Sequence, residues 1–333
     1  QNALELDVQN LLKLDADRLL AGFRETAGYA AGMSDKDIES YMKNKKRYEG
    51  GWENSLIGGH TLGHYMSAVA QGIVNPGVTA EEKEKLTERL NYIIDALNDC
   101  QKKTEGVNGL EGYIFGATLP NSSFKKNVAL QFDNVEKGRA NIATEAWVPW
   151  YTMHKILAGL VDSYQIAGNK TAIEVANKLG TWIADRANNW SSSTQSTVLG
   201  IEYGGMNDAL YQLYKVTDAS NKEDFYKAAH QFDETSLFER VLAGSKNVLN
   251  GKHANTTIPK FLVALCRYET DNTQTKYLQY AESFWQMVKD KHTYITGGNS
   301  EDEHFGADEV LDGERTVCNN ETCNTYNMLK LSR

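Results

Sequence analysis

Proline and cysteine are both scarce in this sequence. Only 4 of the 333 residues are proline and only 4 are cysteine. Because proline removes a backbone donor and interrupts helices, its scarcity leaves long stretches free to be helical. Four cysteines are few for a disulfide framework. Cys100 and Cys266 fall inside apolar helical patterns, which indicates buried thiols rather than bridges.

The sequence also lacks long apolar runs and an excess of basic residues. No run reaches the roughly 18 apolar residues that a membrane span needs. The net charge of −9 argues against nucleic acid as a partner, since phosphate binding needs clustered Lys and Arg. The one basic cluster, residues 43–47, is interpreted as a solvated helix end. With 41% hydrophobic and 24% charged residues, the chain is expected to bury a sizeable core.

Helical periodicity dominates what is present. After an early apolar stripe at residues 86–97, apolar residues recur at helical spacing in three successive pairs of stripes. These pairs fall at residues 156–164 and 175–183, 206–214 and 225–232, and 258–266 and 277–288. Polar breaks separate the two members of each pair, at residues 168–169, 217–218 and 270–271. A repeat of about 50 residues built from helical hairpins predicts either a solenoid or a closed toroid.

Two long irregular insertions decide between these two folds. They occupy about residues 103–145 and 291–317 and interrupt the repeat. Long loops in compact domains are usually functional, and they suit a toroid whose mouth is built up by loops. We therefore expect an all-α fold, an (α/α)6-type toroid of helical hairpins that is incomplete at its C-terminal end.

Polar side chains recur where the repeats begin. His60 and His64 precede one stripe, His154 another, Asn207 a third and His253 the last. In a toroid the starts of equivalent helices meet at one end, so these side chains are predicted to share a pocket. Helix capping is the alternative; Asn caps well, whereas His caps poorly. The pocket is therefore favoured for the histidines, and Asn207 is left open between the two roles.

The densest chemical signal lies between Thr296 and Asn327. A Gly-rich turn leads into an acidic loop that contains Glu301 and Glu303. Carboxylates of a loop are ordinarily solvated, but glycoside cleavage needs a carboxylic acid to protonate the leaving oxygen. Further on, Glu321 and Cys323 stand two residues apart. Zinc accepts both donor types, although two ligands do not make a site.

Cys318 leaves a choice open at this segment. It lies five residues before Cys323 in a polar stretch. It could be a third metal ligand, or the two cysteines could form a disulfide. The sequence alone predicts neither arrangement over the other.

Five motifs in order resemble the glycoside hydrolase family 127 and 146 proteins, the group of the β-L-arabinofuranosidases. They are Gly51-Trp52-Glu53, Gly59-His60 through Gly63-His64-Tyr65, Tyr203-Gly204-Gly205-Met206-Asn207, Thr296-Gly297-Gly298 and Glu321-Thr322-Cys323-Asn324-Thr325. The likeness runs from about residue 10 to the last residue. It implies an (α/α)6 barrel followed by β-sandwich domains, and hydrolysis of terminal arabinofuranose with retention.

The resemblance also implies roles for individual residues. In such enzymes one Glu and three Cys hold a zinc ion, one of the cysteines is the nucleophile, and a separate Glu is the acid/base. Glu321 and Cys323 match the first two zinc ligands. Glu303 best matches the acid/base, with Glu301 as the alternative. His154 and His253 match histidines that contact the sugar.

The remaining expected sugar contacts combine the resemblance with the predicted pocket. They are Trp52, His60, His64 and Asn207. Some members of the group carry a histidine near Met206, where this chain has Met206-Asn207, so that contact departs from the pattern.

The chain departs from the pattern more sharply at its end. The remaining zinc cysteines, the nucleophile among them, would lie downstream of the Glu-Thr-Cys segment, and no cysteine follows Cys323. We therefore expect residues 1–333 to be one catalytic domain, partial, with the β-sandwich domains beyond it. On this expectation the chain alone is inactive.

Two rival functions stand beside this one. Another toroid carbohydrate enzyme, such as an unsaturated uronyl hydrolase, a lyase or a sugar epimerase, would need no zinc. A sugar-binding toroid without catalysis is the second rival. The family resemblance favours a bacterial periplasmic or secreted protein acting on plant-type glycans, while free cysteines also suit the cytoplasm.

Overall fold

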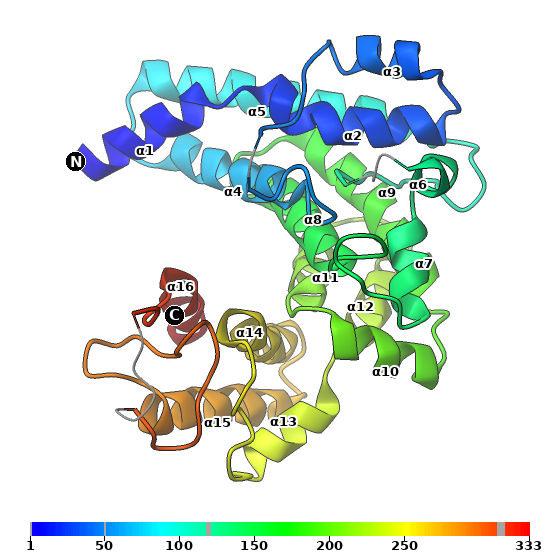
Figure 1. The fold of residues 1–333 in the computed structure, drawn as a ribbon. Helices are drawn as coiled ribbons and strands as arrows, with labels where there is room; N and C mark the ends of the chain where they lie inside the picture. Colours follow the sequence, from blue (N-terminus) through cyan, green and yellow to red (C-terminus); the bar gives the residue numbers. More distant parts are fainter. Residues whose placement is uncertain (1, 50, 118–120, 312–316) are drawn as a thin grey trace. The chain divides into compact units, whose positions relative to one another are not determined.

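The computed structural model divides the chain into two compact units. It describes residues 2–49, 51–117, 121–311 and 317–333. The first unit comprises Gln1–Glu202 and Gln212–Gln231, and the second comprises Tyr203–Tyr211 and Phe232–Arg333 (Figure 1). The boundary runs through one helix, whose first residues belong to the second unit. That residues 1–333 form a single catalytic domain stays a prediction.

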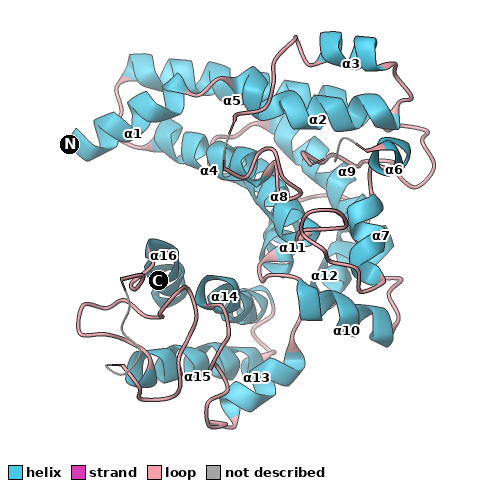
Figure 2. Ribbon diagram, in the orientation of Figure 1, coloured by secondary structure: helices cyan, strands magenta, loops and turns pink. Residues whose placement is uncertain are grey.

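The described residues are helical, with four isolated β-bridges and no strand among them (Figure 2). The helices that lie wholly in the first unit are α1 (Asn2–Lys13), α2 (Ala16–Ala30), α3 (Asp35–Tyr41), α4 (His60–Val74), α5 (Ala80–Lys102), α6 (Ser122–Lys126), α7 (Leu130–Glu136), α8 (Pro149–Gln165), α9 (Lys170–Ala187), α10 (Ser192–Ile201) and α12 (Lys222–His230). Helix α11 (Met206–Val216) is divided between the units. The second unit adds α13 (Thr235–Leu242), α14 (Ala254–Thr270), α15 (Thr275–Lys291) and α16 (Thr322–Ser332).

The predicted hairpins are present, and short polar caps define their ends. Helices α8 and α9 are separated at Gly168 and Asn169, and the Asn169 side chain accepts a hydrogen bond from the Ala172 N–H, which caps α9. Thr79 forms a capping box with Glu82 at the start of α5. Helix α15 follows α14 and packs against it in the same way, and a polar break likewise separates α11 from α12. The polar breaks in the sequence therefore mark real helix ends.

In the first unit α4 packs against α8 (Figure 1). Helix α5 packs against α4, and α9 packs against α8. Glycines allow the close approach. A β-carbon on Gly63 would lie 2.0 Å from the Lys155 carbonyl oxygen, and one on Gly159 would lie 2.5 Å from the Gly63 carbonyl oxygen. The predicted stripe of α5 is fully inside, from Leu86 to Leu97. Burial of these side chains is the main source of the unit's stability.

The second unit is built on α14 and α15. Phe261 of α14 and Phe284 of α15 stack with ring centroids 4.0 Å apart and an interplanar angle of 4°. Helix α16 packs on α14, and α13 packs on α15. The core of this unit therefore fixes the start of α14 and the start of α16 relative to one another, and these two helix ends carry the candidate chemistry.

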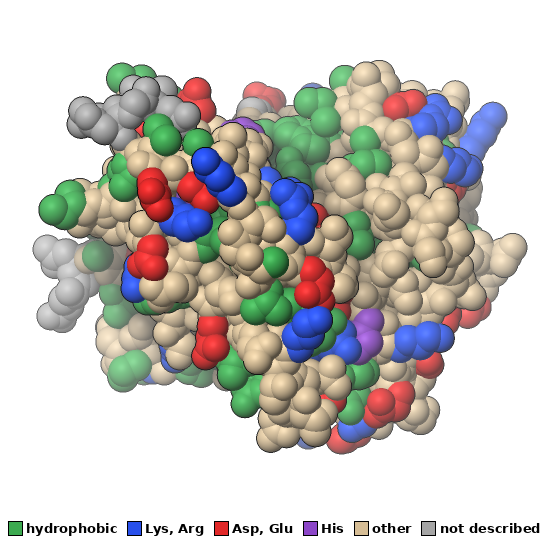
Figure 3. Space-filling model, turned by 90° about the horizontal axis from the view of Figure 1, so that it is seen from below, with side chains coloured by type: hydrophobic (Ala, Val, Ile, Leu, Met, Phe, Trp, Pro, Cys, Tyr) green, Lys and Arg blue, Asp and Glu red, His purple; other side chains and the backbone are tan. Residues whose placement is uncertain are grey.

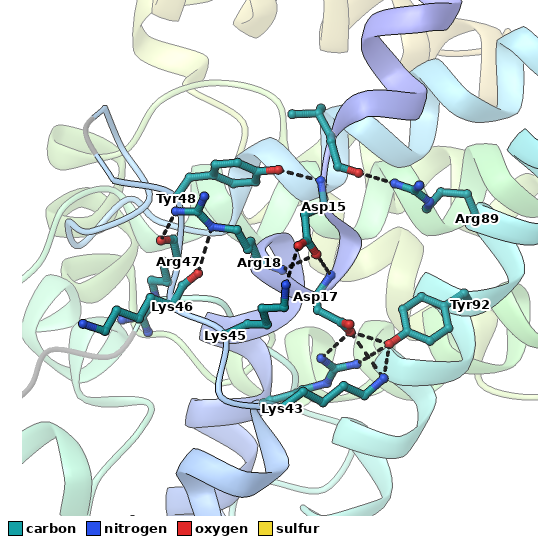
Figure 4. A network of polar contacts seen from close by, with 12 residues as sticks. Asp15, Asp17, Arg18, Lys43, Lys45, Lys46, Arg47, Tyr48, Arg89 and Tyr92 are labelled. Carbon is teal, nitrogen blue, oxygen red and sulfur yellow. Dashed lines mark hydrogen bonds and ion pairs between the residues drawn. The ribbon is translucent and has the colours of Figure 1, made fainter.

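The basic cluster at residues 43–47 is tied to its own unit by ion pairs (Figure 4). Lys45 Nζ lies 3.0 Å from Asp15 Oδ2, and Lys43 Nζ lies 3.5 Å from Asp17 Oδ1. Arg47 pairs with Glu25. The segment follows α3 and its residues 43–46 are exposed, as expected of a solvated helix end, and acidic neighbours lie beside several of its charges.

Charge is mixed on the face that Figure 3 shows, where acidic and basic side chains are interspersed among hydrophobic ones. The surplus of acidic residues, which gives the net charge of −9, is therefore not gathered on that face. Within the described residues, no helix combines the length and the apolarity that crossing a membrane would take.

Candidate active site

Glu303 lies in a loop that is fixed to the start of α14 by backbone hydrogen bonds. The Ala254 N–H donates to the Glu303 carbonyl at 2.7 Å. Two residues further along the loop, the Phe305 N–H donates to the Lys252 carbonyl at 2.9 Å. The Gly251 N–H donates in turn to the Phe305 carbonyl at 2.8 Å. The Phe305 side chain is 2% exposed, so it anchors the loop in the core. Glu303 is thereby placed beside a helix end rather than on a free loop.

The backbone around Glu303 is strained. Ser300, Asp302 and Glu303 have φ values of 74°, 45° and 66°, a region that non-glycine residues seldom adopt. The turn is closed by Glu301 and His304, which exchange N–H to carbonyl hydrogen bonds of 2.9 and 2.8 Å. Such strain costs of order 1–3 kcal/mol per residue and is concentrated at functional sites in proteins.

The Glu303 carboxylate contacts His253. Oε2 of Glu303 lies 3.2 Å from Nε2 of His253, and the carboxylate side chain is 59% exposed. The imidazole is held by Tyr203, whose ring stacks at 6.3 Å and 25°, and by His304, whose ring lies 5.1 Å away. His253 is the N-cap residue of α14, yet its side chain makes no capping hydrogen bond. The imidazole is therefore turned toward the carboxylate.

Tyr203 reaches His253 because its segment docks on α14. The Gly204 N–H donates to the Thr256 carbonyl at 3.3 Å, and a β-carbon on Gly204 would lie 2.6 Å from the Lys260 side chain. A larger residue would lift the segment and separate the two rings. This is a physical reason for a glycine at that position of the Tyr-Gly-Gly motif.

Glu301 has a different environment from Glu303. Its Oε1 accepts a hydrogen bond of 2.9 Å from the Tyr294 hydroxyl, and its side chain is half-buried. The carboxylate that faces solvent beside an imidazole is that of Glu303. The geometry thus distinguishes two carboxylates that the sequence left as alternatives, although the acid/base role itself stays a prediction.

Glu321 and Cys323 begin α16. Glu321 is the N-cap residue, and its Oε2 is buried without a hydrogen-bond partner. Partial burial raises the pKa of the Cys323 thiol, and the neighbouring Glu321 carboxylate raises it further through hydrogen bonding and charge. The charge of the Glu303 carboxylate acts in the same direction.

Two amide side chains tie α16 to the rest of the site. Asn324, which is fully buried, donates to Ser300 Oγ at 2.6 Å. Asn327 donates to Asn255 Oδ1 at 2.7 Å. The loop of Glu303, the start of α14 and the start of α16 are therefore one connected structure.

This part of the chain supplies some of the donors that a zinc ion would take. No group of three or more His, Cys, Asp or Glu side chains in the described ranges is arranged to hold a metal. The pair Glu321 and Cys323 does fit as half of a tetrahedral set, because it combines a thiol with a buried carboxylate oxygen that lacks a partner. Neither Cys318 nor Cys323 forms a disulfide, so the disulfide alternative is not observed.

Asn207 belongs to a buried polar network in the same unit. Its Nδ2 donates to Asp233 Oδ1 at 3.0 Å, and Asp233 Oδ2 accepts from Arg267 at 2.7 Å and from Tyr277 at 2.8 Å. Burial raises the pKa of Asp233, against the opposing effect of these three donors. Asn207 is 2% exposed. Its amide nitrogen is thus engaged inside the protein, and its predicted contact with a sugar stays untested.

The other predicted sugar contacts lie in the first unit. His60 begins α4, with Nδ1 2.9 Å from the Ile57 carbonyl, and its ring lies 6.2 Å from that of His64 and 6.1 Å from that of Tyr151. The Tyr151 ring lies 6.2 Å from that of His154. His154 is buried and lies in the second turn of α8, not at its start. Trp52 is 55% exposed in the loop before α4.

The predicted site residues therefore form two groups. His60, His64 and His154 are joined through Tyr151 in the first unit, with Trp52 on a nearby loop. The second group comprises His253, Glu303, Glu321 and Cys323. Asn207 lies in the same unit, in the buried network around Asp233. That both groups contact one sugar stays a prediction.

Comparison with known proteins decides the family. The whole chain, residues 1–333, matches the family described as β-L-arabinofuranosidase, GH127 catalytic domain. The chain belongs to the GH127 family. No curated protein matches it.

Solved GH127 structures share the fold. The chain matches Ara127N, a GH127 β-L-arabinofuranosidase from Geobacillus stearothermophilus T6, with a TM-score of 0.61 and 15% identity over 94% of this chain and 46% of that one. It matches the GH127 β-arabinofuranosidase BT3674 with a TM-score of 0.58 and 15% identity over 99% and 48%. The predicted fold class, an all-α toroid of helical hairpins, is confirmed. The chain spans about half the length of these relatives.

Sequence reasoning missed several residues of the GH127 chain that shape the two groups. Tyr203 belongs to the Tyr-Gly-Gly motif, and its ring stacks on His253. His304 follows Glu303 directly and contacts the same imidazole. Tyr151 stands three residues before His154, one helical turn away, which is the signal that would have found it. Tyr294 had no such signal.

Proposed function

We propose that this GH127 domain is the catalytic part of a retaining exo-glycosidase that removes terminal β-L-arabinofuranose from plant-type glycans. The observation that carries the proposal is the contact between Glu303 and His253 on a strained loop next to Glu321 and Cys323. Family membership supports the reaction class over a lyase or an epimerase. Because the chain spans about half the length of its solved relatives, the activity is proposed for the whole protein and not for residues 1–333 alone.

Glu303 is the proposed acid/base. Its carboxyl group first donates a proton to the oxygen that leaves the anomeric carbon, and later removes a proton from the water that releases the sugar. Both transfers require a group that is open to the substrate, and the carboxylate is 59% exposed. His253 orients it through the 3.2 Å contact, and the stacked ring of Tyr203 holds the imidazole in place.

Glu321 and Cys323 are the proposed zinc ligands in this chain. A bound zinc would supply positive charge that keeps cysteine sulfur as thiolate and therefore nucleophilic. The buried Oε2 of Glu321 would gain the partner that it lacks. The family resemblance implies two further cysteine ligands, the nucleophile among them, and Cys323 is the last cysteine of residues 1–333.

The proposed sugar contacts are His60, His64, His154, His253, Trp52 and Asn207. Imidazoles offer a donor and an acceptor at once, which suits hydroxyl groups. His154 is held inside α8 and His253 at the start of α14, so both would present fixed nitrogens. Fixed polar groups give a sugar site its orientation and specificity.

The test compares three carboxylates of one loop in the full-length protein. Glu303→Gln should lower kcat/KM for arabinose release by about 100-fold to 10,000-fold, because the proton transfer is lost. Glu309→Gln is the matched control, since Glu309 is also exposed and also has a φ of 66°. Glu301→Gln tests the alternative acid. The loss should be larger with a sugar leaving group than with 4-nitrophenol, which leaves without a proton.

Two results would contradict the proposal. One is wild-type turnover by Glu303→Gln, and the other is a large loss confined to Glu301→Gln. Circular dichroism spectra matching the wild type would establish that each variant is folded.

A further inference from the structure

Trp52 and Trp147 form an exposed aromatic pair in the first unit. The ring of Trp52 is 55% exposed, although an indole is costly to leave in water. The ring of Trp147 meets it edge to face, with centroids 5.3 Å apart and an interplanar angle of 75°. Trp147 is half-buried and lies just before α8. The two rings come from loops that are far apart in the sequence, so local chain geometry does not explain the pair.

A buried amide holds these two loops together. Gln131 of α7 is 1% exposed. Its Nε2 donates to the Leu56 carbonyl at 3.0 Å, in the loop that follows Trp52. Its Oε1 accepts a hydrogen bond of 3.0 Å from the backbone N–H of Trp147. The Gln131 amide therefore donates a hydrogen bond to the Trp52 loop and accepts one from the Trp147 loop. These two bonds fix the separation of the loops.

The Trp52 loop is also closed on itself. The hydroxyl of Ser55 donates to the Trp52 carbonyl at 2.6 Å, and the Ser55 N–H donates to the same oxygen at 3.2 Å. The backbones of both tryptophans are therefore held by defined hydrogen bonds, while Trp52 stays 55% exposed. A ring that is exposed and rigidly held loses little entropy when a ligand covers it.

We propose that Trp52 and Trp147, spaced by Gln131, form a stacking subsite for a sugar ring other than the terminal arabinofuranose. This inference rests on the proposed function for its substrate class, and it moves Trp52 from the predicted pocket of the terminal sugar to a neighbouring subsite. An exo-enzyme must enclose the terminal residue, and a ring that is 55% exposed encloses nothing. A flat indole face instead suits the apolar C–H face of a sugar further along the glycan. Gln131 is a positioning residue, which acts through the two rings.

The first experiment measures equilibrium binding to full-length protein in which Glu303→Gln prevents hydrolysis. The two probes are methyl β-L-arabinofuranoside and a trisaccharide that ends in β-L-arabinofuranose. Trp147→Ala should weaken trisaccharide binding about tenfold and leave the methyl glycoside within about twofold, because only the longer probe reaches the pair. Trp147→Tyr, which restores a flat ring, should recover most of the affinity. Trp285→Ala is the control, a partly exposed tryptophan of the second unit.

The second experiment separates positioning from stability. Gln131→Met keeps the side-chain length but removes both hydrogen bonds, and should weaken trisaccharide binding as Trp147→Ala does. Gln101→Met is the matched control, because Gln101 is also fully buried and donates to the carbonyls of Gly112 and Val175. Both variants should lose stability, but only Gln131→Met should lose the near-ultraviolet dichroism of the coupled indoles.

The outcomes decide between the inference and its failure. Equal weakening of both probes by Trp147→Ala would place the pair in the terminal-sugar pocket and overturn the inference. Unchanged trisaccharide affinity in Trp147→Ala would overturn it as well. Unchanged affinity in Gln131→Met would overturn the positioning role. Failure of the proposed function would appear instead as absent arabinose release by protein that keeps Glu303, with trisaccharide binding retained in the Glu303→Gln protein.

Discussion

At the scale of single residues, His292 is the buried titratable side chain beneath the loop of Glu303. It is 4% exposed and its ring contacts Phe305, with centroids 5.3 Å apart. Burial lowers the pKa of His292, although the Asp308 carboxylate, 3.6 Å away, acts in the opposite direction. The pKa of Asp308 is itself lowered, because the hydrogen bond from Lys291 and nearby charges outweigh its burial.

These shifts predict that acid destabilises the second unit. The unfolded state takes up a proton at His292 near pH 6.5, whereas the folded state resists it until a lower pH. The free energy of unfolding is therefore highest above the pKa that His292 has in the unfolded state. It falls as the pH falls through the lower pKa that His292 has in the folded state. The free energy of unfolding, measured with urea from pH 8 to pH 5, should decrease less in His292→Gln than in the wild type. Parallel pH profiles would contradict this, and the profiles above pH 7.5 serve as the control.

The residues of the candidate site were predictable only in part, because the side chains that they contact are distant in the sequence. The sequence located an acidic loop but left Glu301 and Glu303 as alternatives. His253, the residue that distinguishes them, is 50 positions from Glu303. The same holds for Asn207, whose partner Asp233 is 26 positions away. The sequence predicts capping or sugar contact for Asn207, and nothing in it indicates a buried carboxylate partner.

At the scale of elements, the helix pairs were predictable because periodicity is local. The stripe of α5 and the breaks before α9, α12 and α15 all lie where the apolar spacing put them. The start of α8 was not. His154 was expected to open that helix, but α8 begins five residues earlier at Pro149. Proline favours the first helical turn, and Trp150 and Met153 extend the buried face upstream.

The contact between α4 and α8 predicts how the histidines of the first unit depend on packing. Gly63→Ala places a β-carbon against the Lys155 carbonyl, which cannot move without moving α8. We expect a loss of about 2 kcal/mol or more in the free energy of unfolding, as in other overpacked cores. Gly200→Ala is the control, because Gly200 is exposed in α10 with nothing within 4 Å of an added β-carbon. It should be neutral or stabilising by up to about 1 kcal/mol.

Chemical denaturation of the two glycine variants checks this prediction. A wild-type midpoint for Gly63→Ala would show that the helices separate without cost, and would contradict the packing account. The arrangement of His60, His64 and His154 rests on this contact, since α4 and α8 carry all three.

At the scale of the whole molecule, the GH127 assignment was predictable from ordered motifs, while the joining of distant groups was not. Five motifs in sequence order outweigh any single one, and the family match covers residues 1–333. No periodicity specifies that Tyr203 stacks on His253 or that Gln131 joins two loops, because these contacts depend on tertiary packing.

The proposed metal gives a whole-molecule prediction. Full-length protein should contain about one zinc ion per chain, as expected for a single tetrahedral site. Cys323→Ser should lose most of it, because a hydroxyl is a poor substitute for a thiolate. Cys318→Ser, which changes another exposed cysteine outside any disulfide, should keep it. Elemental analysis after dialysis measures this, and equal zinc content in both variants would remove Cys323 from the ligand set.

The most direct test of the central claim is the anomeric form of the sugar that the full-length protein first releases. Proton NMR spectra recorded during hydrolysis of a β-L-arabinofuranoside resolve the two anomers before they interconvert. The account predicts β-L-arabinofuranose as the initial product, in keeping with retention by double displacement. Initial appearance of the α-anomer, or no arabinose at all from active-site-intact, zinc-loaded protein, would contradict it.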